Sequence, residues 1–232
     1  MINPIYYFYK LSTSQREVIE RNVPFYKKLS EEEKYKFEYR VLKFIKKHNF
    51  VSRGEVRITP IVTAIVASMA VMITFKMKYY LYSQFKNIII YPKNYLSTHS
   101  KRMHKGETNP KAKTIVFSWK GFVEGIKVED DNLNLGIHEF THALYFSFLK
   151  QTNYEARKFI KNTKKIISFL ENKEEQKKII AANYIREYAF ENYHEFLAVI
   201  TENYFETPKE FKTKLPELFV LVNKLYKILA LV

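Results

Sequence analysis

Cysteine does not occur anywhere in the sequence. The chain can therefore form no disulfide and offers no thiolate to a metal ion, so any metal site must use nitrogen and oxygen ligands. Glycine and proline are also scarce, with 5 and 7 residues in a chain of 232. Because no linker rich in these residues and no repeated block is present, the sequence predicts a single compact domain over residues 1–232.

Long uncharged stretches are equally rare. The one candidate for a membrane span is ITPIVTAIVASMAVMITF, residues 58 to 75, which lies at the lower limit of spanning length. Its alanines and hydroxyl residues favour a buried helix with Thr59 as N-cap and Pro60 at the first helical position. A membrane-anchored protein that uses this segment as its span is the alternative. Because the first residues lack the features of a secretory signal, we expect a cytoplasmic protein without a membrane span.

Acidic residues are the minority among the charged ones. The chain has 39 lysines and arginines against 24 acidic residues, a net charge of +15, which invites a nucleic-acid-binding interpretation. The lysines are spread along the whole chain with glutamates close by, and no nucleic-acid-binding motif is present. We therefore interpret the lysines as solvated residues on helix surfaces, and we expect no specific nucleic acid as partner. The alternative is a basic nucleic-acid- or regulator-binding protein with a non-catalytic metal site.

Hydrophobic periodicity and capping signals predict a mostly helical α+β domain. Ser30 and Glu33 form a capping box at the start of one helix. Two β-branched runs, at residues 87–91 and 113–119, predict strands, and the polar segment between them predicts a long loop. Helices are expected at residues 31–48, 59–76, 132–150, 153–171, 174–186, 193–206 and 216–230.

The stretch GIHEFTHALYFSFLK, residues 136 to 150, contains two histidines four positions apart with a glutamate between them. On a helix, His138 and His142 share one face and can both reach one Zn²⁺ ion. Glu139 points away from them and can act as general base toward a water molecule at the metal. The other residues of this helix are apolar or small, so burying the three polar ones without a partner ion would be costly. The motif also follows a predicted strand and a loop containing Asn and Gly, as in zinc peptidases.

A catalytic zinc site requires a third protein ligand and one position for water. The residues after His142 contain no further glycine-and-histidine signature, which excludes the metzincin pattern. The candidates for the third ligand lie in REYAFENYHEFLAVITENYFETPKEF, residues 186 to 211, and are Glu195, His194 and Glu202. Composition does not choose among these three residues.

Several segments together resemble the Mlc titration factor A family of zinc-dependent peptidases. They are YPKNYL, TIVFSWKGFVEG, NLGIHEFTHAL, YAFENYHEFLAVITENYFETPKEF and LPELFVLVNKLY, which follow one another in the order and spacing of that family. The resemblance covers about residues 24–227 and is much more specific than the five-residue histidine motif.

The resemblance implies the roles of individual residues. His138, His142 and Glu195 would be zinc ligands, Glu139 the general base, and Tyr188 a hydrogen-bond donor to the transition state. The implied fold is a zincin-type peptidase domain, with a small sheet beside the motif helix, shared with the catalytic domain of anthrax lethal factor.

The resemblance also implies metal-assisted hydrolysis of peptide bonds with one zinc ion per chain. Members of the family resemble aminopeptidases acting on short substrates, so we expect peptide substrates. One member of the family is named for binding a glucose-responsive repressor, which adds a transcriptional regulator as a candidate partner by resemblance alone. We expect an extended peptide to pair with the strand at residues 114–118, taken as the edge of the sheet.

Besides the harmless replacement of an alanine by Thr141, two departures from the family pattern bear on the site. The Leu-Asp pair that usually follows the second histidine is replaced by Leu144 and Tyr145, which removes a carboxylate. If that carboxylate orients a ligand imidazole, another group must do so here. His194 replaces a small residue beside Glu195, where it either tunes the site or faces water.

Overall fold

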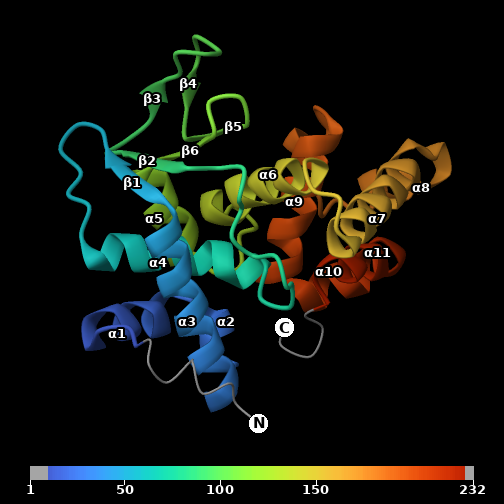
Figure 1. Ribbon diagram of the computed structural model, residues 1–232. Coiled ribbons are helices and arrows are strands. Elements are labelled where there is room, and N and C mark those ends of the chain that lie inside the picture. Colours follow the sequence, from blue (N-terminus) through green and yellow to red (C-terminus); the bar gives the residue numbers. More distant parts are fainter. Residues whose placement is uncertain (1–9, 228–232) are drawn as a thin grey trace.

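The computed structural model describes residues 10–227, and helices make up most of this part of the chain (Figure 1). A four-stranded sheet accompanies them, which confirms the predicted α+β class. The helices are α1 (Thr13–Asn22), α2 (Pro24–Lys27), α3 (Glu31–Lys47), α4 (Pro60–Ile73), α5 (Trp119–Lys127), α6 (Leu135–Leu149), α7 (Tyr154–Glu171), α8 (Lys173–Ala181), the short 3₁₀ helix η2 (Glu187–Phe190), α9 (Tyr193–Glu206), α10 (Pro208–Lys214) and α11 (Pro216–Tyr226). The strands are β1 (Asn49–Ser52), β2 (Asn87–Tyr91), β3 (Tyr95–Leu96), β4 (Met103–His104), β5 (Gly106–Asn109) and β6 (Thr114–Ser118).

The four-stranded sheet has the order β1-β2-β6-β5. Its first three strands are parallel, and β5 pairs antiparallel with β6. The two predicted strands are confirmed as β2 and β6, but the prediction that residues 114–118 form the edge is wrong. The segment predicted as a polar loop folds back along β6 and supplies β5 as the edge strand, while β3 and β4 pair with each other as a separate ribbon (Figure 1).

Helix α4 is the buried helix that the sequence predicts for its long apolar stretch. The Thr59 side chain accepts a hydrogen bond from the backbone N–H of Val62, Pro60 is the first helical residue, and residues 62 to 73 are all buried. Its 14 residues span about 21 Å, less than the roughly 30 Å of a bilayer core. Across residues 10–227, the structure contains no helix that is both long and apolar enough to cross a membrane.

Some predicted helix ends are wrong for local reasons. The helix predicted at 174–186 ends at Ala181, because Asn183 has a positive φ of 46° and Arg186 is extended. The last helix ends at Tyr226, where Lys227 takes the left-handed conformation, and residues 228–230 of that prediction lie outside the described residues. The motif helix begins after Asn134, whose side chain accepts from the backbone N–H of residue 137.

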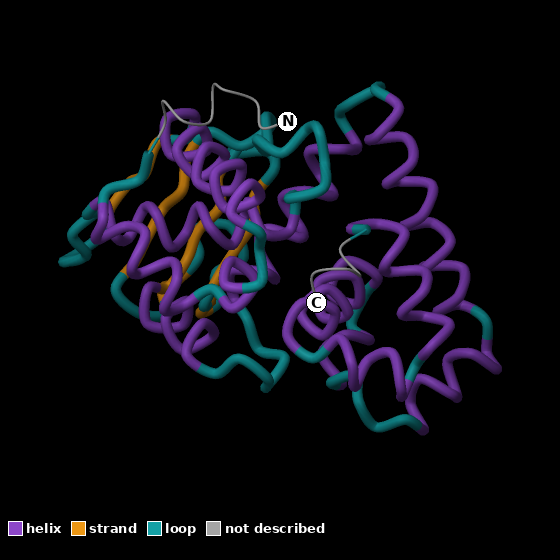
Figure 2. Tube along the Cα trace, turned by 90° about the horizontal axis from the view of Figure 1, so that it is seen from below, coloured by secondary structure: helices purple, strands orange, loops and turns teal. Residues whose placement is uncertain are grey.

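Other elements were not predicted, among them α1, α2, α5, α10 and β1. Helix α5 is the one next to the motif helix in the chain. It follows β6 and precedes α6, where the sequence predicted only a loop. Helix α6 packs against β5 and β6 and also contacts α4, α5, α7 and α9. In Figure 1 the C-terminal helices α7, α8, α10 and α11 lie on the side away from the sheet, and Figure 2 shows that this part of the molecule contains no strand among the described residues. The motif helix therefore lies between the sheet and the C-terminal helices.

Candidate metal centre

Helix α6 presents both histidines of the motif on one face. The N-cap Asn134 fixes where this helix begins, and the four-residue spacing then brings the two imidazoles together. The Nε2 atoms of His138 and His142 lie 3.1 Å apart, and the rings are nearly perpendicular at 87°. Two ring nitrogens therefore converge on one point beside the helix.

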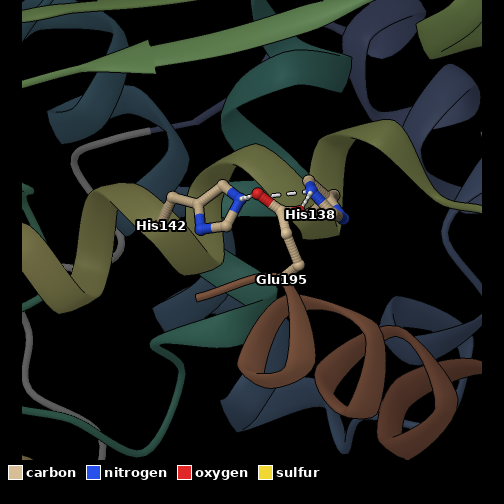
Figure 3. A group of neighbouring side chains, drawn as sticks. All are labelled: His138, His142 and Glu195. Carbon is tan, nitrogen blue, oxygen red and sulfur yellow. Dashed lines mark hydrogen bonds and ion pairs between the residues drawn. The ribbon is translucent and has the colours of Figure 1, made fainter. Parts of the chain in front are cut away.

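Helix α9 contributes the third side chain. Asn192 caps this helix by accepting hydrogen bonds from the backbone N–H groups of His194 and Glu195, which places Glu195 in the first turn. Glu195 Oε2 lies 2.9 Å from His138 Nε2, and Oε1 lies 3.6 Å from His142 Nε2 (Figure 3). The structure thus brings together the three residues that the resemblance implies as ligands.

Glu202, the second carboxylate on α9, contacts the other nitrogen of His138. Its side chain is 1% exposed, and its Oε1 accepts a hydrogen bond from His138 Nδ1 at 2.8 Å. Arg186 donates to both carboxylate oxygens at 2.7 and 3.1 Å, and the backbone N–H of Asn134 donates to Oε2 at 2.7 Å. When His138 is neutral with its hydrogen on Nδ1, its Nε2 has a lone pair directed at the centre and available to a cation.

The geometry of the three converging groups fits a small divalent cation. Donor atoms at about 2.0–2.2 Å from a tetrahedral zinc ion lie about 3.3 Å from one another. The two Nε2 atoms are 3.1 Å apart, and their contacts with Glu195, at 2.9 Å to Oε2 and 3.6 Å to Oε1, lie on either side of that value. Glu195 Oε2 is buried, and despite its closeness to His138 it has no hydrogen bond of good geometry among the described residues. Buried acceptor atoms that converge in this way need a cation or protons between them, and the arrangement suits a metal ion.

Without a cation the cluster is held by shared protons. Burial lowers the pKa of His138, but its contacts with Glu195 and Glu202 outweigh this effect and raise the pKa to about 10. Burial likewise opposes ionisation of Glu195, but the two imidazoles hold the pKa of this carboxyl well below its usual range. Without a metal ion, protonated His138 therefore supplies the positive charge that offsets the Glu195 carboxylate.

Glu139 lies on α6 beside the cluster and is fixed by strand β5. The Thr108 hydroxyl lies 2.8 Å from Glu139 Oε2 and 3.0 Å from its backbone oxygen, and it can donate to either. Gly106 is required for this close approach, because a Cβ atom at that position would lie 2.5 Å from Glu139 Oε1. Burial raises the pKa of Glu139, although the two histidines and the hydrogen bond from Thr108 oppose the shift. The carboxyl group is thus held in place beside the three candidate ligands.

Tyr188 lies in η2, on the open side of the site. Its ring centroid is 6.0 Å from that of His138, and its side chain is half-exposed. Partial burial, together with the charge of Glu195 and a hydrogen bond to it, raises the pKa of the Tyr188 phenol. Tyr188, His138 and Glu139 line a hollow of about 480 Å³. The phenol therefore keeps its proton at neutral pH and can donate a hydrogen bond into this hollow.

A comparison with known protein families finds a match that covers nearly the whole chain. The model of the glucose-regulated metallo-peptidase M90 family matches residues 6–227. The chain belongs to this family of metallopeptidases. It is also similar to the uncharacterized protein slr2042 of Synechocystis sp., with 22% identity over 226 residues, which covers 88% of this chain and 80% of that protein. The family membership confirms the resemblance found in the sequence, whereas the relation to anthrax lethal factor stays a prediction.

The two departures from the family pattern contact each other in this M90 protein. The ring of Tyr145 lies 5.0 Å from that of His194, which also packs against Phe146 and Tyr193 at 5.2 and 4.0 Å. The His194 ring is 6.4 Å from that of His142 and does not reach the converging donor atoms. His194 therefore belongs to an aromatic wall beside the site.

Sequence reasoning missed several residues that shape this M90 site. Glu202 was considered only as a rival ligand, whereas it holds the outer nitrogen of His138 and so supplies an orienting carboxylate despite the replacement at Tyr145. The seven-residue spacing from Glu195 to Glu202 was an available signal, because it places both on one face of α9. Arg186 and Thr108 gave no comparable signal, because their contacts depend on how separate segments pack.

Proposed function

We propose that the protein is a zinc-dependent peptidase in which His138, His142 and Glu195 hold the metal ion. The observation that carries this proposal is the convergence of two imidazole nitrogens and a carboxylate, with His138 oriented from behind by Glu202. The absence of cysteine leaves nitrogen and oxygen as donors, and zinc accepts this set in catalytic sites. Membership in a metallopeptidase family supports the same assignment.

When bound, the zinc ion lowers the pKa of a coordinated water molecule and polarises the carbonyl group of the scissile bond. Glu139 is the general base that takes a proton from the attacking water and returns it to the leaving amine. Thr108 holds the carboxylate in position by its hydrogen bond to Oε2. Tyr188 donates a hydrogen bond to the carbonyl oxygen as negative charge develops there.

The outer edge of β5 is the surface on which we place an extended peptide. One edge of this strand pairs with β6, and no other strand of the described chain pairs with the opposite edge. Because Thr108 in this strand contacts Glu139, a peptide added to the free edge passes next to the proposed base. Pairing through the backbone gives affinity without requiring a particular substrate sequence.

For the substrate class we propose short peptides with a free amino terminus, an aminopeptidase-like preference that follows from the resemblance to the family. The test measures the metal content of purified protein by elemental analysis and the hydrolysis of alanyl peptides with a free or an acetylated amino terminus. We expect about one zinc ion per chain, activity that is lost on chelation and restored by Zn²⁺, and faster cleavage of the free peptides. Hydrolysis that chelation leaves unchanged would contradict the proposal, and equal rates on both peptides would contradict only the aminopeptidase preference.

A further inference from the structure

A second hollow lies beyond the proposed site, at the far end of β5 and α6. Its volume is about 700 Å³, and its lining includes four lysines from three separate segments, Lys86, Lys111, Lys113 and Lys150. All four are exposed, and no acidic side chain lines the hollow or pairs with them among residues 10–227. We call this group of residues the lysine hollow.

The wall of the lysine hollow also contains a buried polar group without a partner. The Ser147 side chain is 1% exposed, and its Oγ has no hydrogen-bond partner in the described part of the protein. Gln84, which also lines the hollow, likewise has a buried Oε1 without a partner among the described residues. A hollow lined by a hydroxyl donor and four ammonium groups is a suitable environment for a carboxylate. Lys150 follows the C-terminus of α6, where a cation is favoured in any case, but the other three lysines have no such explanation.

The lysine hollow is continuous with the aromatic wall of the proposed site. Phe146 lines the hollow and packs against His194, whose ring is 6.4 Å from that of His142. Along α6, the residues from His142 to Phe146 and Lys150 correspond to about 6 and 12 Å. Along the edge strand, Gly106 lies against Glu139 and Pro110 lines the hollow, a separation of about 13 Å for an extended chain. Both measures give a distance of about two to four residues of extended peptide.

We propose that the lysine hollow binds an acidic side chain of the peptide substrate, about two to four residues from the scissile bond. This inference rests on the proposed peptidase function and adds a preference for acidic peptides to it. Because an aminopeptidase-like cleavage leaves only the first residue on the amino side of the bond, the acidic residue lies on the carboxyl side, which requires the peptide to run parallel to β5. Nucleic acid fits less well, because four lysines around one concave site do not form the extended stripe that a phosphate backbone follows.

The experiment uses alanine-based peptides that carry one aspartate or one asparagine at each position in turn, with the cleaved bond identified by mass spectrometry. For wild type we expect kcat/KM for the best aspartate peptide to exceed that of its asparagine match about tenfold, and this ratio to fall at high salt. The triple variant Lys86→Gln, Lys111→Gln, Lys150→Gln should lose most of this ratio while cleaving the asparagine peptides at the wild-type rate.

A matched control removes the same charge elsewhere. Lys161, Lys164 and Lys165 are exposed on α7 and do not line the lysine hollow, so their replacement by Gln should leave the aspartate preference intact. The charge reversal Lys150→Glu should weaken the aspartate preference and improve cleavage of peptides with lysine at the same position. The affinity of the Glu139→Gln variant for the same peptides measures binding at the hollow separately from hydrolysis.

The outcomes separate the two proposals. If wild type cleaves aspartate and asparagine peptides equally well, the inference about the lysine hollow is wrong and the peptidase function stands. If no peptide is cleaved but aspartate peptides bind and the triple variant does not bind them, the hollow is a site for acidic peptides and the peptidase proposal fails. If a short DNA duplex binds through the same lysines and aspartate confers no advantage, the hollow is a nucleic-acid interface and the inference is overturned.

Discussion

Replacement of Glu202 by Gln tests whether this carboxylate orients His138 or binds the metal itself. Gln keeps the shape but removes the charge that accepts from His138 Nδ1, from Arg186 and from the backbone of Asn134. Loss of an orienting carboxylate typically lowers metal affinity about 10- to 100-fold, equivalent to roughly 1.4–2.7 kcal/mol. The metal-free protein should also lose about 2–3 kcal/mol of stability, because hydrogen bonds to a buried charge are broken. Arg186 is partly exposed, so water limits the cost of its lost partner.

Zinc affinity is measured by competition with a chromophoric chelator, and stability by urea unfolding in the presence of excess chelator. The control is Glu191→Gln, which removes one exposed carboxylate from the same region. Glu202→Gln should weaken zinc binding within the stated range and keep a stoichiometry of one ion, whereas the control should change neither quantity. Zinc affinity equal to wild type would refute the orienting role, and a complete loss equal to that of Glu195→Ala would make Glu202 a ligand.

Four further predictions address the other residues of the site and its surroundings. Glu139→Gln should retain about one zinc ion per chain and lose nearly all hydrolysis, because the amide keeps the shape but cannot accept the proton; zinc loss measured by elemental analysis would make Glu139 a ligand. Glu195→Ala should abolish stoichiometric zinc retention while His194→Ala preserves it, and reversed metal contents would indicate a three-histidine site. Tyr188→Phe should lower kcat about 10- to 1,000-fold with little change in KM, zinc content or melting temperature, and an unchanged kcat would remove Tyr188 from the mechanism. Burial raises the pKa of Glu206 to about 8 from 4.5, so the folded protein holds a proton that the unfolded chain releases; the free energy of unfolding should fall as the pH rises between these values, and Glu206→Gln should flatten that dependence.

The elements with strong periodicity and clear capping residues could be predicted from the sequence. Helix α4 begins at Pro60 after the Thr59 cap, and α3 begins after Ser30 with its capping box, as predicted. The helix predicted at 193–206 is α9 itself. In these segments the local sequence signals agree with the burial of the residues in the folded protein, so the sequence alone is sufficient to predict the helix.

The edge of the sheet could not be predicted, because β3, β4 and β5 have no hydrophobic alternation. Strand β5 has the sequence GETN, and it is a strand because its backbone pairs with β6 and its Thr108 contacts α6. Both interactions involve residues that lie close only after folding. The lysine hollow could not be predicted for the same reason. Its lysines, at positions 86, 111, 113 and 150, are dispersed along the sequence and lie close only after folding.

The separate roles of the two glutamates on α9 follow from how this helix crosses α6. Glu195 lies near His138 and His142, whereas Glu202 lies near His138 and the backbone of Asn134. Moving toward the C-terminus of α9 therefore means moving toward the N-terminus of α6, and seven residues of α9 cover about 10 Å. The sequence can place both carboxylates on one face of their helix, but it does not contain the direction or position of the crossing. Reversing that direction would exchange the two carboxylates, so the proposed ligand set depends on the packing of α9 against α6 as much as on the histidine motif.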